Sequence, residues 1–486
     1  MVAPVRLRVF VRGAVACAGI GVLLATAATA GARGQRHQTA HVLATRATIP
    51  LRTALFDPYS FVGASNAFDM AKAAGASYVR LPFSWSSVAP EKDGPDFVAN
   101  DPTAYSWSGL DQTVTAVEAA GLQPMLDIVS PPKWAFAVKP SGRKAGTPSV
   151  SQLGQFAQAL AKHFNGVDGP PVRVYQVWNE PNNSLDLSPV KPATYRSMVN
   201  AVANSVHKVS SKNLVIAGGL DPFENLASDF VSQAPLAYMR AVLCLSKGAH
   251  PHRTCKAKIH FDIWSHHPYT FGGPFGKAKR PDDVSLGDLS KMTTLLRAAR
   301  RLHTVVSSHP IQFWVTEFSW DTSPPRRHAA PLALQARWTA ESLHQMWLSG
   351  VSLVTWFLLQ DRPKPSVYQS GLYFHSKSLD KAKAKPTRTA FRFPFVAYLG
   401  NGTVSVWGRD ATSTKKLVTI QRRTGIRGHW RTVARIEPNR YGIFKATLKL
   451  KASSKDWLRA QASGSGNSLA FSLTVPKDSR YGPWGN

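Results

Sequence analysis

Short apolar runs and amphipathic stretches alternate along the chain from about residue 51 to residue 398. There are eight apolar runs, each of four to eight residues. Runs of this length without polar alternation are typical of strands that are buried on both faces, as in a parallel sheet. The runs cover residues 53–56, 77–83, 123–129, 172–178, 214–218, 259–265, 311–317 and 351–358.

The stretches between these runs carry the periodicity of helices. Leu153, Phe156, Ala157, Leu160 and Phe164 fall at positions i, i+3, i+4, i+7 and i+11 of one helical face. A strand followed by a helix, repeated eight times over about 350 residues, predicts an α/β fold, the (β/α)8 TIM barrel. An open doubly wound sheet is the alternative, but the sequence after the first run lacks the Gly-rich phosphate loop typical of that arrangement.

The pattern changes at about residue 399. Six short runs of strand-forming residues follow, separated by polar or Gly-containing turns, and this spacing predicts a small C-terminal β-sandwich. Such a domain binds carbohydrate or packs against the barrel, and we favour packing. The runs cover residues 402–407, 417–421, 430–436, 441–448, 457–462 and 469–474.

The first thirty residues have the pattern of a secretory signal. Arg6, Arg8 and Arg12 precede an apolar segment at 14–27, and Ala28-Thr29-Ala30 forms a small-x-small cleavage site. No later run reaches the roughly 18 apolar residues of a membrane helix, so we expect a secreted, extracellular protein with no membrane span after signal removal. A retained N-terminal anchor is the alternative. The predicted organisation is a signal at 1–30, a linker at 31–50, a catalytic barrel at 51–398 and an accessory sandwich at 399–486.

Only two cysteines remain once the signal is removed, since Cys17 lies within it. Two cysteines that lie close in sequence in an exported chain predict a disulfide between Cys244 and Cys255, with two unpaired thiols as the alternative. Closing this short loop stabilises the fold by about 3 kcal/mol in the chain-entropy view. The sequence contains no CxxC or HExxH motif, and we therefore expect no metal site.

The chain is strongly basic, with 59 Lys and Arg against 28 Asp and Glu and a formal net charge of +31. Such a charge favours polyanionic partners, such as an acidic polysaccharide or a cell-wall polymer. A generally basic surface without a specific partner is the alternative. No nucleic-acid-binding module is recognisable in the sequence, so we expect no nucleic-acid partner. Acidic residues are sparse after Gly371 and comprise Asp380, Asp410, Glu437, Asp456 and Asp478.

Two glutamates stand at the ends of apolar runs, where the reactive residues of a (β/α)8 barrel are found. Glu180 follows the fourth run in Trp178-Asn179-Glu180-Pro181, and Glu317 closes the seventh run in Trp314-Val315-Thr316-Glu317. A carboxylate held among apolar side chains loses solvation, and its pKa rises toward the range of a general acid. A single such glutamate is usually a salt-bridge partner or a helix cap. Two of them, each near a tryptophan, favour a catalytic pair.

The motif Trp178-Asn179-Glu180-Pro181 resembles the Asn-Glu-Pro signature of the clan A glycoside hydrolases, a cellulase-like group of retaining (β/α)8-barrel glycosidases. The resemblance covers roughly residues 51–398. It implies that Glu180 is the acid/base and that Glu317, after the seventh strand, is the nucleophile of a double displacement. It implies a carbohydrate substrate and requires no metal or organic cofactor.

The resemblance also assigns roles to residues at other strand ends. Arg80 would hold the nucleophile ionised, and Asn179 would hydrogen-bond the 2-hydroxyl of the sugar. Adjacent strand residues point to opposite sides, so only one of the two consecutive histidines after the sixth strand can face the pocket. We select His267, with Tyr269 donating to the nucleophile. Trp356, at the end of the eighth strand, resembles the sugar-stacking platform of the clan.

The leading hypothesis is thus a retaining hydrolase that cleaves O-glycosidic bonds of a poly- or oligosaccharide. Two alternatives stand beside it. The first is a carbohydrate-binding barrel without catalysis, which would bind a sugar and release no product. The second is a transglycosylase that acts on an envelope polysaccharide, which would make longer oligomers rather than shorter ones.

Overall fold

A computed structural model of the chain describes residues 40–42, 49–62, 66–227, 229–364, 368–412, 416–476 and 480–484. These residues belong to one compact unit that begins at Thr39. The predicted signal at 1–30 lies outside the described residues. No helix within the described ranges is long and apolar enough to span a bilayer.

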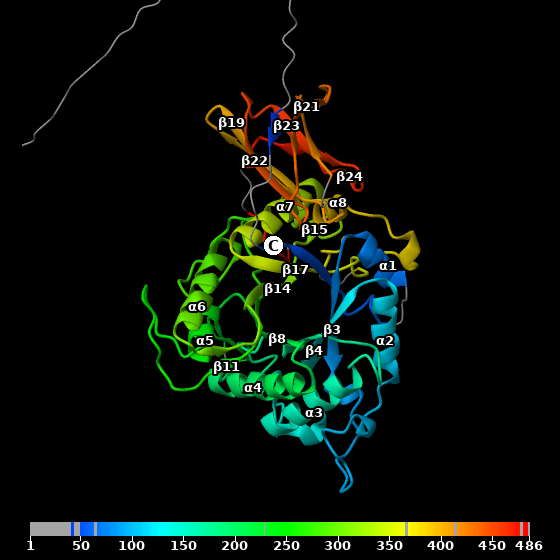
Figure 1. Cartoon of the computed structure of the whole chain (residues 1–486), viewed down its shortest axis with the longest axis vertical. Coiled ribbons are helices and arrows are strands. Elements are labelled where there is room, and N and C mark those ends of the chain that lie inside the picture. The colour runs from blue at the N-terminus through cyan, green and yellow to red at the C-terminus, as the bar shows by residue number, and fades with distance from the viewer. Residues whose placement is uncertain are drawn as a thin grey trace, which may run out of the picture. The chain divides into compact units, whose positions relative to one another are not determined.

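Eight parallel strands close into a barrel, and all eight coincide with the apolar runs of the sequence (Figure 1). The (β/α)8 prediction is therefore confirmed. The order of the strands around the barrel is their order in the sequence. The last strand pairs with the first, with Leu353 opposite Arg52. The strands are β2 (Arg52–Phe56), β3 (Tyr78–Ser84), β4 (Gln123–Val129), β7 (Val174–Val177), β8 (Leu214–Leu220), β12 (Ile263–His266), β14 (Gln312–Phe318) and β17 (Val351–Phe357).

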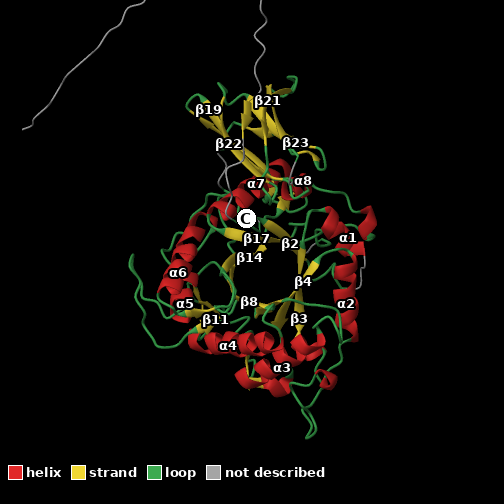
Figure 2. Ribbon diagram, viewed as in Figure 1, coloured by secondary structure: helices red, strands yellow, loops and turns green. Residues whose placement is uncertain are grey.

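Helices surround the barrel and cover its outer face (Figure 2). The residues of the helical face predicted at 153–164 are fully buried. The helices are α1 (Asn66–Ala73), α2 (Ser108–Ala119), α3 (Val150–His163), α4 (Pro192–Val209), α5 (Pro235–Val242), α6 (Leu289–Arg301), α7 (Leu332–Leu348) and α8 (Pro386–Arg392). Short hairpins and strand pairs lie in the connections: β5 (Phe136–Val138) with β6 (Thr147–Pro148), β9 (Asn225–Ala227) with β10 (Phe230–Ser232), β11 (Ile259–His260) with β13 (Val305–Val306), and β15 (Thr322–Ser323) with β16 (Ala330–Pro331).

A separate apolar cluster fills the inside of the barrel, and each of the eight strands contributes one residue to it. Burial of these side chains closes the barrel interior, so polar groups at the strand ends face a cavity rather than a channel. The cluster consists of Ala54, Tyr78, Met125, Val174, Ile216, Ile263, Trp314 and Leu353.

The C-terminal region forms two sheets that share the main hydrophobic core, in agreement with the expected small sandwich. Strand β18 crosses the expected domain boundary at 398/399. Within the segment 31–50, which we assigned to a linker, residues 40–42 form strand β1 and pair in parallel with β21. One sheet contains β18 (Phe395–Gly400), β19 (Thr403–Arg409) and β22 (Ile443–Lys449); the other contains β1 (Ala40–Val42), β20 (Val418–Thr424), β21 (Arg431–Ile436), β23 (Asp456–Ala462), β24 (Gly466–Asn467) and β25 (Phe471–Ser472).

These sheets pack on the barrel through aromatic and polar contacts. The ring of Trp407 lies 5.8 Å from that of Trp347 on α7, and the guanidinium of Arg409 donates to the hydroxyl of Thr53 at 3.2 Å. Packing against the barrel, which we favoured for this region, is thus observed.

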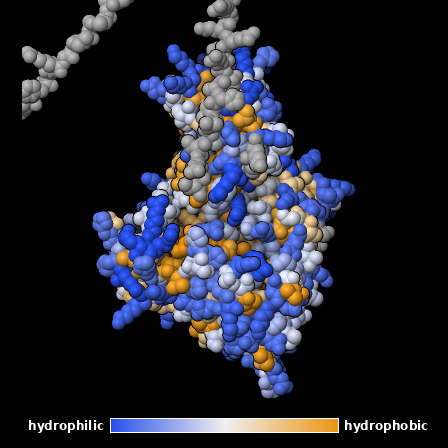
Figure 3. Space-filling model, in the orientation of Figure 1, coloured by the Kyte–Doolittle hydropathy of each residue, from blue (hydrophilic) through white to orange (hydrophobic). Residues whose placement is uncertain are grey.

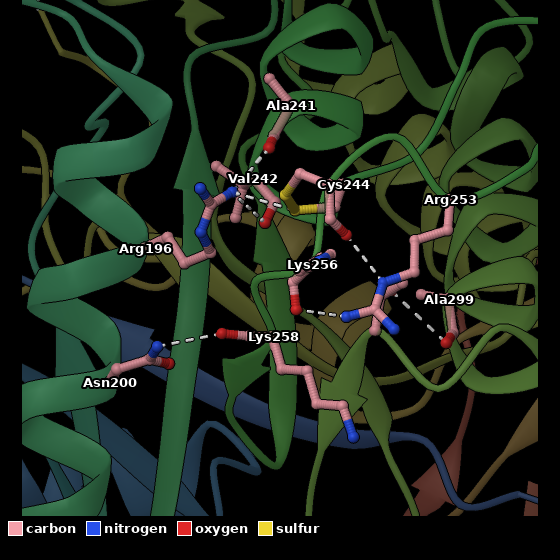
Figure 4. Close-up of a disulfide and its surroundings, with 11 residues drawn as sticks. Arg196, Asn200, Ala241, Val242, Cys244, Arg253, Lys256, Lys258 and Ala299 are labelled. Carbon is pink, nitrogen blue, oxygen red and sulfur yellow. Dashed lines mark hydrogen bonds between the residues drawn. A yellow bond between two sulfur atoms is a disulfide. The ribbon is translucent and has the colours of Figure 1, made fainter.

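The disulfide between Cys244 and Cys255 is present, with Cα atoms 5.2 Å apart (Figure 4). It closes a loop after α5. In the same view, Arg196 from α4 donates to the carbonyl oxygens of Ala241 and Val242 at 2.9 and 3.2 Å. Arg196 also donates to Cys244 Sγ at 3.4 Å, so the start of the loop is tied to α4.

Candidate active site

Glu180 and Glu317 line one cavity of about 420 Å³ at the C-terminal ends of the barrel strands. Their side chains are 20% and 16% exposed, so both carboxyl groups are largely buried. The site thus brings together Glu180, from the loop after β7, and Glu317 of β14, which are 137 residues apart in the sequence. The other lining residues are Phe56, Pro58, Tyr59, Asp221, Pro222, Tyr269, Arg326, Phe357, Tyr368 and Trp484.

The backbone that presents Glu180 is strained. Trp178 and Glu180 have φ angles of +71° and +35°, a region that costs residues other than glycine roughly 1–3 kcal/mol each. Hydrogen bonds hold this conformation: Trp178 N donates to Ile128 O at 3.2 Å, and Glu180 N donates to Gly219 O at 3.0 Å. The indole of Trp178 also donates to Asp186 O at 2.7 Å. The neighbouring strands β4 and β8 therefore fix the position of the carboxylate.

Arg80 joins three side chains at the base of the cavity. It is 1% exposed, and its guanidinium donates to Glu317 Oε2 at 2.9 Å, to Asp127 Oδ2 at 2.6 Å and to Asn179 Oδ1 at 2.7 Å. A buried cation with two carboxylate partners is neutralised and held rigid. The guanidinium favours the ionised form of Glu317, against the effect of burial, and fixes its orientation.

The second oxygen of Glu317 is also held. The hydroxyl of Tyr269 donates to Glu317 Oε1 at 2.8 Å. Burial raises the pKa of Tyr269 well above its usual value, so the hydroxyl keeps its proton at neutral pH. Both oxygens of Glu317 therefore accept hydrogen bonds from fixed donors.

Glu180 has neutral hydrogen-bond partners instead. Nδ1 of His267 lies 2.9 Å from Glu180 Oε1, and the amide of Asn183 donates to Oε2 at 2.9 Å. Nε2 of His267 pairs with the hydroxyl of Thr316 at 3.1 Å. Burial lowers the pKa of His267 well below its usual range, with Arg80 adding to the effect, so the imidazole is neutral. Among the described residues, the side chains that hydrogen-bond Glu180 are therefore neutral.

These surroundings separate the pKa values of the two glutamates. Burial raises the pKa of Glu180 well above its usual value, and the negative charges of Asp221, Asp186 and Glu317 raise it further. Burial also raises the pKa of Glu317, but Arg80 and the hydrogen bond from Tyr269 oppose that rise. A pair of carboxyls pushed apart in this way can divide into a proton donor and an ionised nucleophile.

Most of the residues that the sequence singled out are brought together here, namely Arg80, Asn179, Glu180, His267, Tyr269 and Glu317. The amide of Asn179 also donates to Asp186 Oδ1 at 2.9 Å. The histidine next to His267 points away, and Nε2 of His266 pairs with the carbonyl oxygen of Val284.

Trp356 does not lie at the cavity, so the platform assigned to it must be corrected. It is 1% exposed, its ring packs against Phe318 and Phe391 at 6.0 and 6.2 Å, and its indole donates to Ser370 O. Leu353 of the same strand fills the barrel interior, so alternation turns position 356 outward and position 357 inward. Phe357 accordingly lines the cavity.

Several residues of the site were not predicted. Asp127 pairs with Arg80, Asn183 donates to Glu180, and Asp186 and Asp221 lie near Glu180. Asp127 had a detectable signal, because it is a carboxylate inside an apolar strand run. Trp484 had none. Within the described ranges, no group of three or more His, Cys, Asp or Glu side chains is arranged to hold a metal ion.

A protein-family model, Cellulase (glycosyl hydrolase family 5), matches residues 42–356. This range contains the first seven barrel strands, all of β17 except its last residue, and both glutamates. No curated protein sequence matches the chain.

Solved structures with the same fold include a monomeric β-xylosidase from Caulobacter crescentus, with 15% identity and a TM-score of 0.50 over 79% of this chain and 85% of that one. A GH39 enzyme from Xanthomonas axonopodis pv. citri also has 15% identity and a TM-score of 0.50, over 86% of this chain and 96% of that one. At such identities, the likeness establishes the barrel fold alone.

Proposed function

This chain belongs to the cellulase family, glycosyl hydrolase family 5, within the clan A glycosidases, and from that premise we propose that it is a retaining hydrolase with Glu317 as nucleophile and Glu180 as acid/base. The observation that carries the proposal is the contrast between the two carboxyls in one cavity. Glu317 is held by a guanidinium and a phenol, whereas Glu180 is surrounded by neutral partners and nearby negative charge.

In the first step, an oxygen of Glu317 forms a bond to the anomeric carbon while the bond to the leaving oxygen breaks. Glu180 transfers its proton to that departing oxygen. In the second step, Glu180 takes a proton from water, the water oxygen bonds to the anomeric carbon, and the ester to Glu317 breaks. Arg80 and Tyr269 stabilise the carboxylate that leaves in this second step.

We predict a bell-shaped pH dependence of kcat/KM whose alkaline limb reports Glu180, because only its protonated form can act as acid. Asp221→Asn removes a negative charge that raises the pKa of Glu180. The pKa of Glu180 should fall, and the alkaline limb should move to lower pH by roughly half a unit or more. The measurement is kcat/KM of an aryl glycoside against pH.

Asp229→Asn is the matched control, since Asp229 is 60% exposed and pairs with Arg143 at the surface. This variant should leave both limbs in place. An alkaline limb that stays fixed in Asp221→Asn, or that moves to higher pH, would contradict the assignment of Glu180.

We further propose that the enzyme acts outside the cytoplasm on a polysaccharide with anionic groups. The signal pattern at 1–30 and the disulfide support export. In the C-terminal sheets, the guanidinium groups of Arg423 and Arg459 lie 4.7 and 4.3 Å from the ring of Trp430. On the face shown in Figure 3, hydrophilic residues cover most of the described surface. Arginine with an aromatic ring suits a polymer that presents both anionic groups and sugar faces.

Product analysis on a mixed panel tests the function. Wild-type protein and Glu317→Gln are incubated with neutral gluco-, xylo- and manno-configured polysaccharides and with acidic polysaccharides, at low and at high salt. We expect sugar products from the wild type alone, with the anomeric configuration of the substrate when followed by NMR. Cleavage of an acidic polymer that weakens at high salt would support the anionic substrate.

Other products separate the alternatives. Binding without products would favour a non-catalytic barrel. Oligomers longer than the substrate would favour a transglycosylase. Products with inverted anomeric configuration would exclude double displacement.

A further inference from the structure

The cavity of Glu180 and Glu317 includes an indole from the far end of the chain. Trp484 lines this cavity, although it follows the last strand of the C-terminal sheets. It lies 304 residues from Glu180 in the sequence and is half-buried. The segment 480–484 therefore passes from the C-terminal sheets to the mouth of the barrel.

This segment is held by the same loops that carry the catalytic groups. Gly272 N donates to Tyr481 O at 3.0 Å, in the connection that follows Tyr269. Asp321 N donates to Pro483 O at 2.7 Å, four residues after Glu317. The ring of Tyr481 lies 6.3 Å from that of Trp338 on α7, and Pro483 is buried. The backbone on both sides of Gly482 is thus fixed before it reaches Trp484.

The ring of Trp484 is placed by aromatic neighbours. It lies 5.0 Å from the ring of Tyr269, at an interplanar angle of 41°, and 6.4 Å from that of Phe271 in an edge-to-face arrangement. Tyr269 is the residue whose hydroxyl donates to Glu317. The side chain of Tyr269 therefore links Trp484 to Glu317 by direct contacts with both.

A half-buried indole that lines an open cavity has apolar surface that a ligand can still cover. A pyranose ring offers a matching face of C–H groups, and burial of large aromatic surfaces dominates recognition at such sites. Trp356, which the sequence favoured for this role, is enclosed in the core.

We propose that Trp484 is a substrate-binding residue that stacks on the apolar face of a pyranose ring beside Glu317, so that segment 480–484 is part of the active site. This inference rests on the proposed function for the identity of its ligand as a sugar. Tyr269 then has two tasks, since it orients Glu317 and supports the ring of Trp484.

The test is binding, measured by calorimetry in a Glu317→Gln background with cellotetraose, xylotetraose, mannotetraose and an acidic oligosaccharide. We expect Trp484→Ala to raise Kd of the best ligand by about tenfold or more, as loss of one apolar contact surface does. Trp484→Phe should restore part of this loss, because it keeps a ring at the same position. Tyr441→Ala, an aromatic residue in the turn before β22 that does not line this cavity, should leave Kd unchanged.

The outcomes separate this inference from the proposed function. Equal Kd values with and without the Trp484 ring would overturn the inference, while hydrolysis by the wild type would leave the function intact. Weaker binding in Trp484→Ala, in a protein that hydrolyses nothing on the panel, would support the inference and contradict the function. Binding to none of the four ligands would count against both. If Trp484→Ala also lowers Tm, the Trp484→Phe variant decides. With a purely structural role of Trp484, the Trp484→Phe variant would regain the wild-type Kd only if it also regained the wild-type Tm.

Discussion

Replacing Glu317 with Gln should lower kcat by at least about four orders of magnitude while the protein keeps its fold. The side chains have nearly the same shape. The remaining carbonyl oxygen can accept from Arg80, and the new amide can donate to the hydroxyl of Tyr269. What disappears is the ionised oxygen that forms the bond to the anomeric carbon. Single-turnover kinetics with an aryl glycoside measures this loss.

An external nucleophile identifies the missing step. In Glu317→Gly, azide can occupy the vacated space and attack from the same face, in one displacement. The glycosyl azide should then have the opposite anomeric configuration to the substrate. Glu224→Gln is a suitable control, because Glu224 pairs with Arg280 at the rim and should keep wild-type turnover. A Glu317→Gln variant within tenfold of the wild type would contradict its role as nucleophile.

Replacing Glu180 with Ala should give losses that depend on the leaving group. For substrates with poor leaving groups, kcat/KM should fall by about 10²- to 10⁴-fold, because the departing oxygen no longer receives a proton. For a dinitrophenyl glycoside, whose leaving group needs no proton, kcat/KM should fall far less. The second step also loses its base, so the ester to Glu317 should accumulate and be visible by mass spectrometry of the intact protein.

Azide distinguishes this variant from the previous one. It should react with the accumulated ester from the face opposite Glu317 and give a glycosyl azide with the configuration of the substrate. Asn183→Ala, which removes one hydrogen bond to Glu180, should show a smaller loss that is the same for all leaving groups. A uniform loss in Glu180→Ala would identify Glu180 as a positioning residue and not as the acid.

The sequence predicted the barrel because strands buried on both faces leave continuous apolar runs. All eight runs became barrel strands, including β7, which has only four residues. The two glutamates of the cavity were predictable for a related reason: Glu180 follows such a run and Glu317 ends one, where a charge is costly unless it has a function. These signals are local, and each can be read within about ten residues.

Other parts of the site were decided only by tertiary structure. Whether the side chain of Trp356 points into the barrel or away from it depended on which residues of β17 fill the barrel interior. The apolar run 351–358 contains no alternation of apolar and polar residues that reveals this direction. The partners of Arg80 come from β4, β14 and the loop after β7, and strand order alone does not specify their contacts.

Trp484 shows the difference most clearly. Its own neighbourhood in the sequence carries no apolar period and no motif, and its place beside Tyr269 follows from two backbone hydrogen bonds to loops at 272 and 321. The sequence by itself determined the barrel, its strand ends and the two carboxylates, because burial acts on each residue through its immediate chain environment. The packing of distant segments determined the charges, the hydrogen bonds and the aromatic surface around those carboxylates, because such contacts exist only once the chain has closed on itself.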